Sequence, residues 1–146
     1  MFGFWLFLHL TGLAVWIGSL LAIVVMLQLL KKQLGSQESN TLAKRVMRVF
    51  SMFAHPASVI VLISGVIMIV QMDLGTDKPL WLDVMEKGGG TIILLALVLT
   101  GIVGSKAKKR LNDPHGKRVN LSGYLTTLLG VMVLVVAVVL VASLKL

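Results

Sequence analysis

The residues of this chain with the clearest capacity for chemistry are two histidines inside long apolar segments. His9 lies seven residues before Trp16 in the segment from Phe2 to Leu30, so the two side chains share one face of a helix. An imidazole in hydrocarbon costs several kcal/mol without a partner, so that face must point into protein. A neutral imidazole there could coordinate a metal ion or the iron of haem, or could form a hydrogen bond to a carbonyl or hydroxyl group of a neighbouring helix.

The second histidine and one lysine are further candidates. His55 precedes Pro56, which is expected to kink its helix, and residue counting separates His55 from His9 by roughly 15 Å in depth. One metal ion is poorly placed to bind both imidazoles, so His55 is either a ligand at another site or a structural residue. Lys87 matches the depth of His9 better. It either pairs with Asp83, four residues earlier, or turns inward as an acid, a base or a partner for a tetrapyrrole propionate.

Three methionines near the end of the bundle that holds His9 suggest a second kind of cofactor. They are Met68, Met72 and Met85. Thioether sulfur suits monovalent copper, so these side chains together with His9 would form a copper site. Methionine is also an ordinary filler of apolar cores, and that alternative stays open.

The elements that must position these residues are transmembrane helices. The chain has 146 residues, of which 57% are hydrophobic and only 14% charged, and its mean hydropathy is +0.94. This composition is typical of an integral membrane protein and leaves no room for a soluble catalytic domain. The absence of cysteine excludes disulfides and thiolate metal sites. A single domain over residues 1–146 is expected, with four spans of about 20 or more apolar residues at about 2–30, 46–72, 84–104 and 121–144.

The charges between the spans predict the orientation in the membrane. Eleven of the fourteen lysines and arginines lie in the connections between the first and second spans and between the third and fourth. By the positive-inside rule these connections are cytoplasmic and both termini are extracytoplasmic. We therefore expect an all-α, antiparallel four-helix bundle that spans a membrane, with no role for nucleic acid despite the net charge of +8. His115 falls in a turn-forming stretch of the second basic connection and is not expected to bind a metal.

Small residues recur every seven positions and predict the packing faces of the helices. The columns are Ser51, Ser58 and Gly65 in the second span, Lys87, Leu94 and Gly101 in the third, and Gly123, Gly130 and Ala137 in the fourth. Small residues let helix backbones approach closely, so each column is expected to face its neighbours. The third interpretation of the sequence is a bundle without any cofactor. Such a bundle would serve a structural or partner-binding role, or would form a homodimer through these glycines.

Three motifs occur in the first three spans. They are an early histidine followed by Trp-x-Gly (His9, Trp16, Gly18), an arginine followed by x-Pro-Ala and a glycine (Arg48, His55-Pro56-Ala57, Gly65), and Trp-Leu followed by a lysine (Trp81-Leu82, Lys87). Over about residues 1–105 this pattern resembles a known family, the haem-containing, oxygen-independent protoporphyrinogen oxidases of bacteria, and the resemblance implies the inner membrane of a bacterium.

The resemblance implies particular roles for these residues. His9 would be the axial ligand of a b-type haem, Trp16 a wall of its pocket and Lys87 the essential lysine. The activity would be porphyrinogen oxidation, with electrons passed to a membrane quinone or to a neighbouring protein. The first helix is also similar to that of the copper-resistance D-type membrane domains, which implies copper binding or transport through His9 as the alternative.

Overall fold

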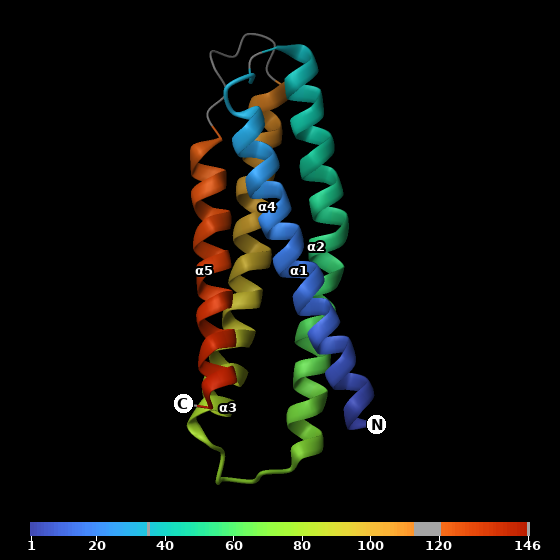
Figure 1. Ribbon diagram of the computed structural model, residues 1–146, viewed down its shortest axis with the longest axis vertical. Coiled ribbons are helices and arrows are strands. Elements are labelled where there is room, and N and C mark those ends of the chain that lie inside the picture. Colours follow the sequence, from blue (N-terminus) through green and yellow to red (C-terminus); the bar gives the residue numbers. More distant parts are fainter. Residues whose placement is uncertain (35, 113–120, 146) are drawn as a thin grey trace.

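The computed structural model describes residues 1–34, 36–112 and 121–145, and in these residues all regular structure is helical (Figure 1). Four helical stretches within this part of the chain are long and apolar enough to cross a membrane, which confirms the predicted four-span fold. His115 lies outside the described residues. The elements are α1 (Phe2–Leu30), α2 (Gln37–Met72), α3 (Leu80–Asp83), a π-helical turn η1 (Val84–Gly89), α4 (Gly90–Asn112) and α5 (Ser122–Leu144).

Two of the helical segments are longer than the predicted spans. α2 begins at Gln37 instead of residue 46, because Ser36 caps it: the Ser36 Oγ accepts a hydrogen bond from the Ser39 backbone N–H at 3.2 Å. α2 then continues through Pro56 as one helix. The third span, predicted at 84–104, extends over Leu80–Asn112 because α3, η1 and α4 follow one another without a break. The extra turns at the start of α2 and at the end of α4 are mainly polar, whereas α3 is mostly apolar.

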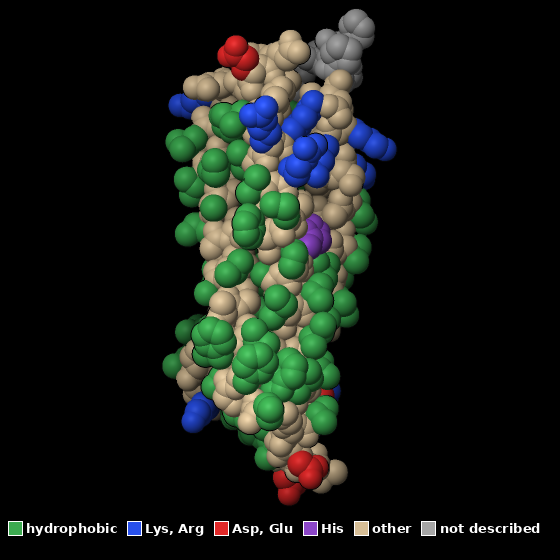
Figure 2. Space-filling view, turned by 90° about the vertical axis from the view of Figure 1, so that its right-hand side faces the viewer, with side chains coloured by type: hydrophobic (Ala, Val, Ile, Leu, Met, Phe, Trp, Pro, Cys, Tyr) green, Lys and Arg blue, Asp and Glu red, His purple; other side chains and the backbone are tan. Residues whose placement is uncertain are grey.

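The helices run antiparallel, with both termini and the α2–α3 connection at one end of the bundle (Figure 1). We call this the termini end, and the opposite end, where α1 meets α2, the basic end. Lysine and arginine side chains gather mainly at the basic end, while apolar side chains cover the length between the two ends (Figure 2). An apolar belt bounded by charged ends indicates a multi-pass membrane protein.

α1 and α2 lie in close contact at Gly12. A Cβ atom at this position would lie 2.8 Å from Cγ2 of Val61 and 3.2 Å from the carbonyl oxygen of Ala57. Both distances are shorter than ordinary van der Waals contact, so only glycine fits there without a shift. This contact sets the separation of α1 and α2 at the level of His9, one turn away.

The small-residue columns predicted for the third and fourth spans are wrong, whereas Ser58 and Gly65 of the second do pack inward. A Cβ added at Gly101, Gly123 or Gly130 would meet nothing within 4 Å. Residues outside these columns occupy the interior instead. They are Ile93, Ala96, Gly104, Ala107 and Leu111 of α4, and Tyr124, Leu125, Leu128, Val131 and Val135 of α5. Because lipid is as apolar as these side chains, the hydrophobic effect does not choose the inward face, and shape complementarity does.

We predict that Gly12→Ala destabilises the bundle by about 1–3 kcal/mol, the usual cost of forcing a methyl group into a packed interface. Gly18→Ala is the matched control on the same helix, because a Cβ there meets nothing within 4 Å. The control is expected to be neutral, or to stabilise by up to about 1 kcal/mol through helix propensity. Unfolding of the purified protein in mixed micelles measures both. Equal stability of the two variants would contradict the close approach.

Candidate functional site

His9 is held by two hydrogen-bond partners on α2. Its Nδ1 lies 2.9 Å from the carbonyl oxygen of Val61 and 3.2 Å from Oγ of Ser64. Because a carbonyl oxygen only accepts, Nδ1 carries the proton and donates it, with the Ser64 hydroxyl as a second acceptor. The Ser64 hydroxyl in turn donates to the carbonyl oxygen of Ile60 at 2.6 Å. The hydrogen bond to a neighbouring helix, one of the two interpretations of His9, is therefore present.

The same arrangement leaves the other ring nitrogen of His9 available as a ligand. In the neutral imidazole, Nε2 carries the lone pair when Nδ1 carries the proton, and Nε2 has no hydrogen-bond partner among the described residues. Metal-binding histidines usually donate their second N–H to a carbonyl or carboxylate, which fixes the tautomer and the ring orientation. Gly65 adds a steric constraint, since a Cβ there would lie 3.2 Å from Cε1 of His9.

A cavity of about 400 Å³ lies beside His9, with walls from α1, α2, α3, η1, α4 and α5. It extends from Trp16 to Phe2 in the first turn of α1, and to Met72 and Ser143 in the last turns of α2 and α5, all at the termini end. The volume falls within the roughly 300–1,000 Å³ of small-molecule sites, and the lining is predominantly apolar, as in such sites. Its chemically distinctive side chains are His9, Trp16, Met68, Met72, Trp81, Met85, Glu86 and Ser143.

Most of the residues singled out from the sequence therefore meet at one place. His9 and Trp16 line the cavity together, as their shared helix face predicts, and Trp16 is only 4% exposed. The three methionines line it as well, from α2 and η1. The structure thus brings one imidazole and three thioethers to a single apolar cavity.

Lys87 and His55 are not part of this cavity. The Lys87 side chain is 76% exposed and its Nζ lies 2.8 Å from Oδ1 of Asp83. Lys87 therefore forms the ion pair on the helix surface and does not turn inward. His55 donates from Nδ1 to the carbonyl oxygen of Ser51 at 2.9 Å, one turn earlier in its own helix. His9 and His55 accordingly share no metal site. In the described part of the chain, no three histidine, aspartate or glutamate side chains come together as a metal-binding group.

The charged residue that does reach the cavity was missed by the sequence analysis. Glu86 of η1 lines the cavity, and its Oε2 lies 2.7 Å from Nζ of Lys78 in the α2–α3 connection. The signal was present in the helical spacing: Glu86 follows Leu82 by four residues, and Leu82 is 1% exposed. Asp83 and Lys87 lie one position further on and so face the surface.

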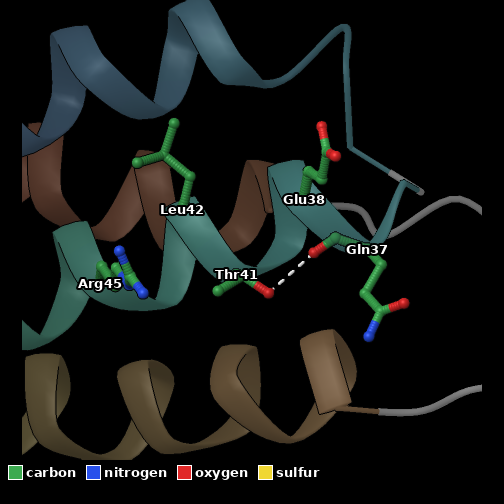
Figure 3. A pocket seen from close by; sticks show the side chains of 5 residues that line it. All are labelled: Gln37, Glu38, Thr41, Leu42 and Arg45. Carbon is green, nitrogen blue, oxygen red and sulfur yellow. Dashed lines mark hydrogen bonds between the residues drawn. The ribbon is translucent and has the colours of Figure 1, made fainter.

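A second recess of about 420 Å³ lies at the basic end, but it offers no convergent chemistry. It is lined by Gln37, Glu38, Thr41, Leu42 and Arg45, all from the first turns of α2. Figure 3 shows these side chains spreading away from one helix, with the Thr41 hydroxyl donating to the carbonyl oxygen of Gln37 at 2.8 Å. A recess made by one polar helix surface lacks the opposing walls of a ligand site.

The donor set of the cavity fits an iron porphyrin or a soft metal ion. Imidazole nitrogen and thioether sulfur are both axial ligands of haem iron, and thioethers also suit monovalent copper.

Comparison of the chain with protein-family models, with curated proteins and with solved structures finds no match.

We predict that imidazole ¹H–¹⁵N spectra of the purified protein show both His9 and His55 as the Nδ1–H tautomer, since each donates to a carbonyl oxygen. Gly65→Ala should shift the His9 resonances, because the added methyl group displaces the ring by a few tenths of an ångström. The His55 resonances should not move, and Gly101→Ala, whose methyl group meets nothing, should change neither histidine. An Nε2–H tautomer of His9 would contradict this geometry.

Proposed function

We propose that the protein binds a b-type haem or a related porphyrin in the cavity at the termini end, with Nε2 of His9 as axial ligand. The observation that carries the proposal is the position of His9: its Nδ1–H is bound to the Val61 carbonyl, and its ring lines an apolar cavity of about 400 Å³. Haem would supply one-electron chemistry at this site.

The remaining residues of the cavity support a binding role. Trp16 and Leu13 continue the face of α1 that carries His9 and offer flat or apolar surface beside the imidazole. Met68 of α2 is 5% exposed and lines the same cavity, so its thioether would be available as a second ligand. These side chains exclude water and orient a planar apolar group.

Porphyrinogen oxidation is an activity that only the family resemblance predicts for this protein. That resemblance assigns the essential lysine to Lys87, which pairs with Asp83 on the outer surface of the bundle. Proton transfer during such an oxidation needs an acid or base within hydrogen-bond reach of the substrate. Glu86, and not Lys87, lines the cavity, so an enzyme with this structure would use Glu86 for such a proton transfer.

Copper binding is the second candidate, and one observation favours it. Met68, Met72 and Met85 line the same cavity as His9, which is the soft ligand set expected for monovalent copper. This function predicts metal in the purified protein without a visible porphyrin spectrum.

We further propose that the basic end faces the cytoplasm of a bacterial cell and the termini end faces outward. The support is the charge distribution, with Lys31, Lys32, Lys44 and Arg45 at the basic end. Lys44 also donates a hydrogen bond to Asn112 there, which ties α2 to α4 close to the membrane surface.

A reduced-minus-oxidised spectrum of the protein, purified from cells supplied with a haem precursor, tests the haem proposal. The wild type should show a Soret band and visible bands, and His9→Ala should lose at least nine tenths of them, because iron loses its protein ligand. His55→Ala is the matched control, since His55 makes a hydrogen bond of the same 2.9 Å length but lies outside the cavity.

Two results would overturn the proposal: no porphyrin spectrum in the wild type, or a spectrum that survives His9→Ala unchanged. Metal analysis of the same samples separates the copper alternative. Copper that is lost in His9→Ala and in Met68→Leu, without any visible bands, would establish copper binding instead.

The orientation is tested by single cysteines, because the chain has none of its own. Thr76→Cys lies in the α2–α3 connection and Gln33→Cys after α1, and both positions are exposed. In intact spheroplasts a membrane-impermeant maleimide should label the first and spare the second, and lysis should expose both. Labelling of Gln33→Cys from outside would reverse the assignment.

A further inference from the structure

The only charged side chain that lines the cavity, within the described residues, is Glu86, and it is paired with Lys78. The two side chains are about one third exposed, at 33% and 32%, so the pair lies at the edge between the apolar cavity and the termini end. Lys78 belongs to the α2–α3 connection, which closes the bundle at this end (Figure 1). The Lys78 ammonium group therefore lies beside the one carboxylate that lines this otherwise apolar cavity in the described part of the chain.

Lys78 keeps hydrogen-bonding capacity in this position. An ammonium group has three donors, and the contact with Oε2 of Glu86 at 2.7 Å uses one of them. Glu86 thus positions the Lys78 Nζ and accepts from only one of its N–H donors. A second carboxylate could accept from Nζ while the pair with Glu86 stays intact.

The other lysine of this end does not have that access. Lys87 is paired with Asp83 on the opposite side of η1 and is 76% exposed, so it faces away from the cavity. Asp73 and Asp77, in the same connection as Lys78, are exposed and would repel an anion. The attractive charge for an acidic group at this end of the cavity is therefore Lys78.

The polar boundary also matches the way in which amphiphiles lie in a membrane. Their apolar bodies stay in hydrocarbon and their acidic groups stay at the interface. Leu10 and Val66 line the cavity and are also 56% and 54% exposed on the lipid-facing surface. A lipid-dissolved molecule can contact these side chains from the bilayer while its acidic group remains level with Lys78.

We propose that Lys78, positioned by Glu86, is the anion-binding residue of the cavity, and that the ligand is an amphiphile with an apolar body and a carboxylate directed to the termini end. This inference rests on the proposed binding function, because it assigns the polar end of the same site. It excludes neutral apolar molecules as preferred ligands.

Metal-free porphyrins with and without free carboxylates test the inference. Protoporphyrin IX carries two carboxylates, and its dimethyl ester has the same apolar body without them. Binding of each to the full chain in non-ionic detergent is followed by quenching of tryptophan emission, since Trp16 and Trp81 line the cavity. The wild type should bind the acid about tenfold more tightly than the ester, the effect of one charge-assisted hydrogen bond.

Lys78→Met should abolish this preference and leave the affinity for the ester unchanged, which also shows that the variant is folded. Lys78→Arg keeps the cation and should keep the preference. Lys87→Met is the matched control and should behave as the wild type, because Lys87 is paired away from the cavity. A preference that survives Lys78→Met, or equal binding of acid and ester by the wild type, would overturn the inference, as would binding of neither probe.

The outcome is separable from that of the haem proposal, because the probes contain no iron and do not require coordination by His9. A His9-dependent haem spectrum with an acid preference independent of Lys78 would leave the haem proposal intact and overturn this one. A Lys78-dependent preference without any haem spectrum would do the reverse.

Discussion

A histidine inside a hydrocarbon layer must find its hydrogen-bond partners within the protein, and His9 finds them on α2. The Nδ1–H of His9 is shared between the carbonyl oxygen of Val61, at 2.9 Å, and the hydroxyl of Ser64, at 3.2 Å. This interaction requires α1 and α2 to lie close together, which Gly12 permits against Val61 and Ala57. It also fixes the ring in the Nδ1–H tautomer, so that Nε2 carries the lone pair.

The cavity exists because the bundle is packed unevenly. Where Gly12 faces α2, the first two helices are in close contact. Towards the termini end, α1, α2, η1 and α5 surround a space of about 400 Å³ that their apolar side chains do not fill. Glycines of η1 and α4 contribute little bulk to its wall, since Gly89 and Gly90 both line it. In water such a cavity would cost stability, whereas in a membrane an apolar ligand or lipid chain can occupy it.

Charge is divided between the two sides of η1, and this division gives the termini end its polarity. Glu86 faces the cavity and holds Lys78 at its edge, while Asp83 and Lys87 pair on the outer surface. Two ion pairs of similar length, 2.7 and 2.8 Å, therefore have different consequences. One includes the carboxylate that lines the cavity, and the other lies on the surface of the helix, where an exposed pair contributes little to stability.

The sequence by itself determined the four spans, their antiparallel order and the inward direction of His9 and Trp16. Apolar length and charge set the first two, and the cost of an unpartnered imidazole set the third. Only the tertiary structure decided which faces of the third and fourth spans pack, and that Glu86 rather than Lys87 reaches the cavity. A helix that is apolar all round carries no periodic signal for its inward face, because lipid and protein interior solvate its side chains equally well. The fit between side chains of different helices makes that choice, and this fit cannot be calculated from any one helix alone.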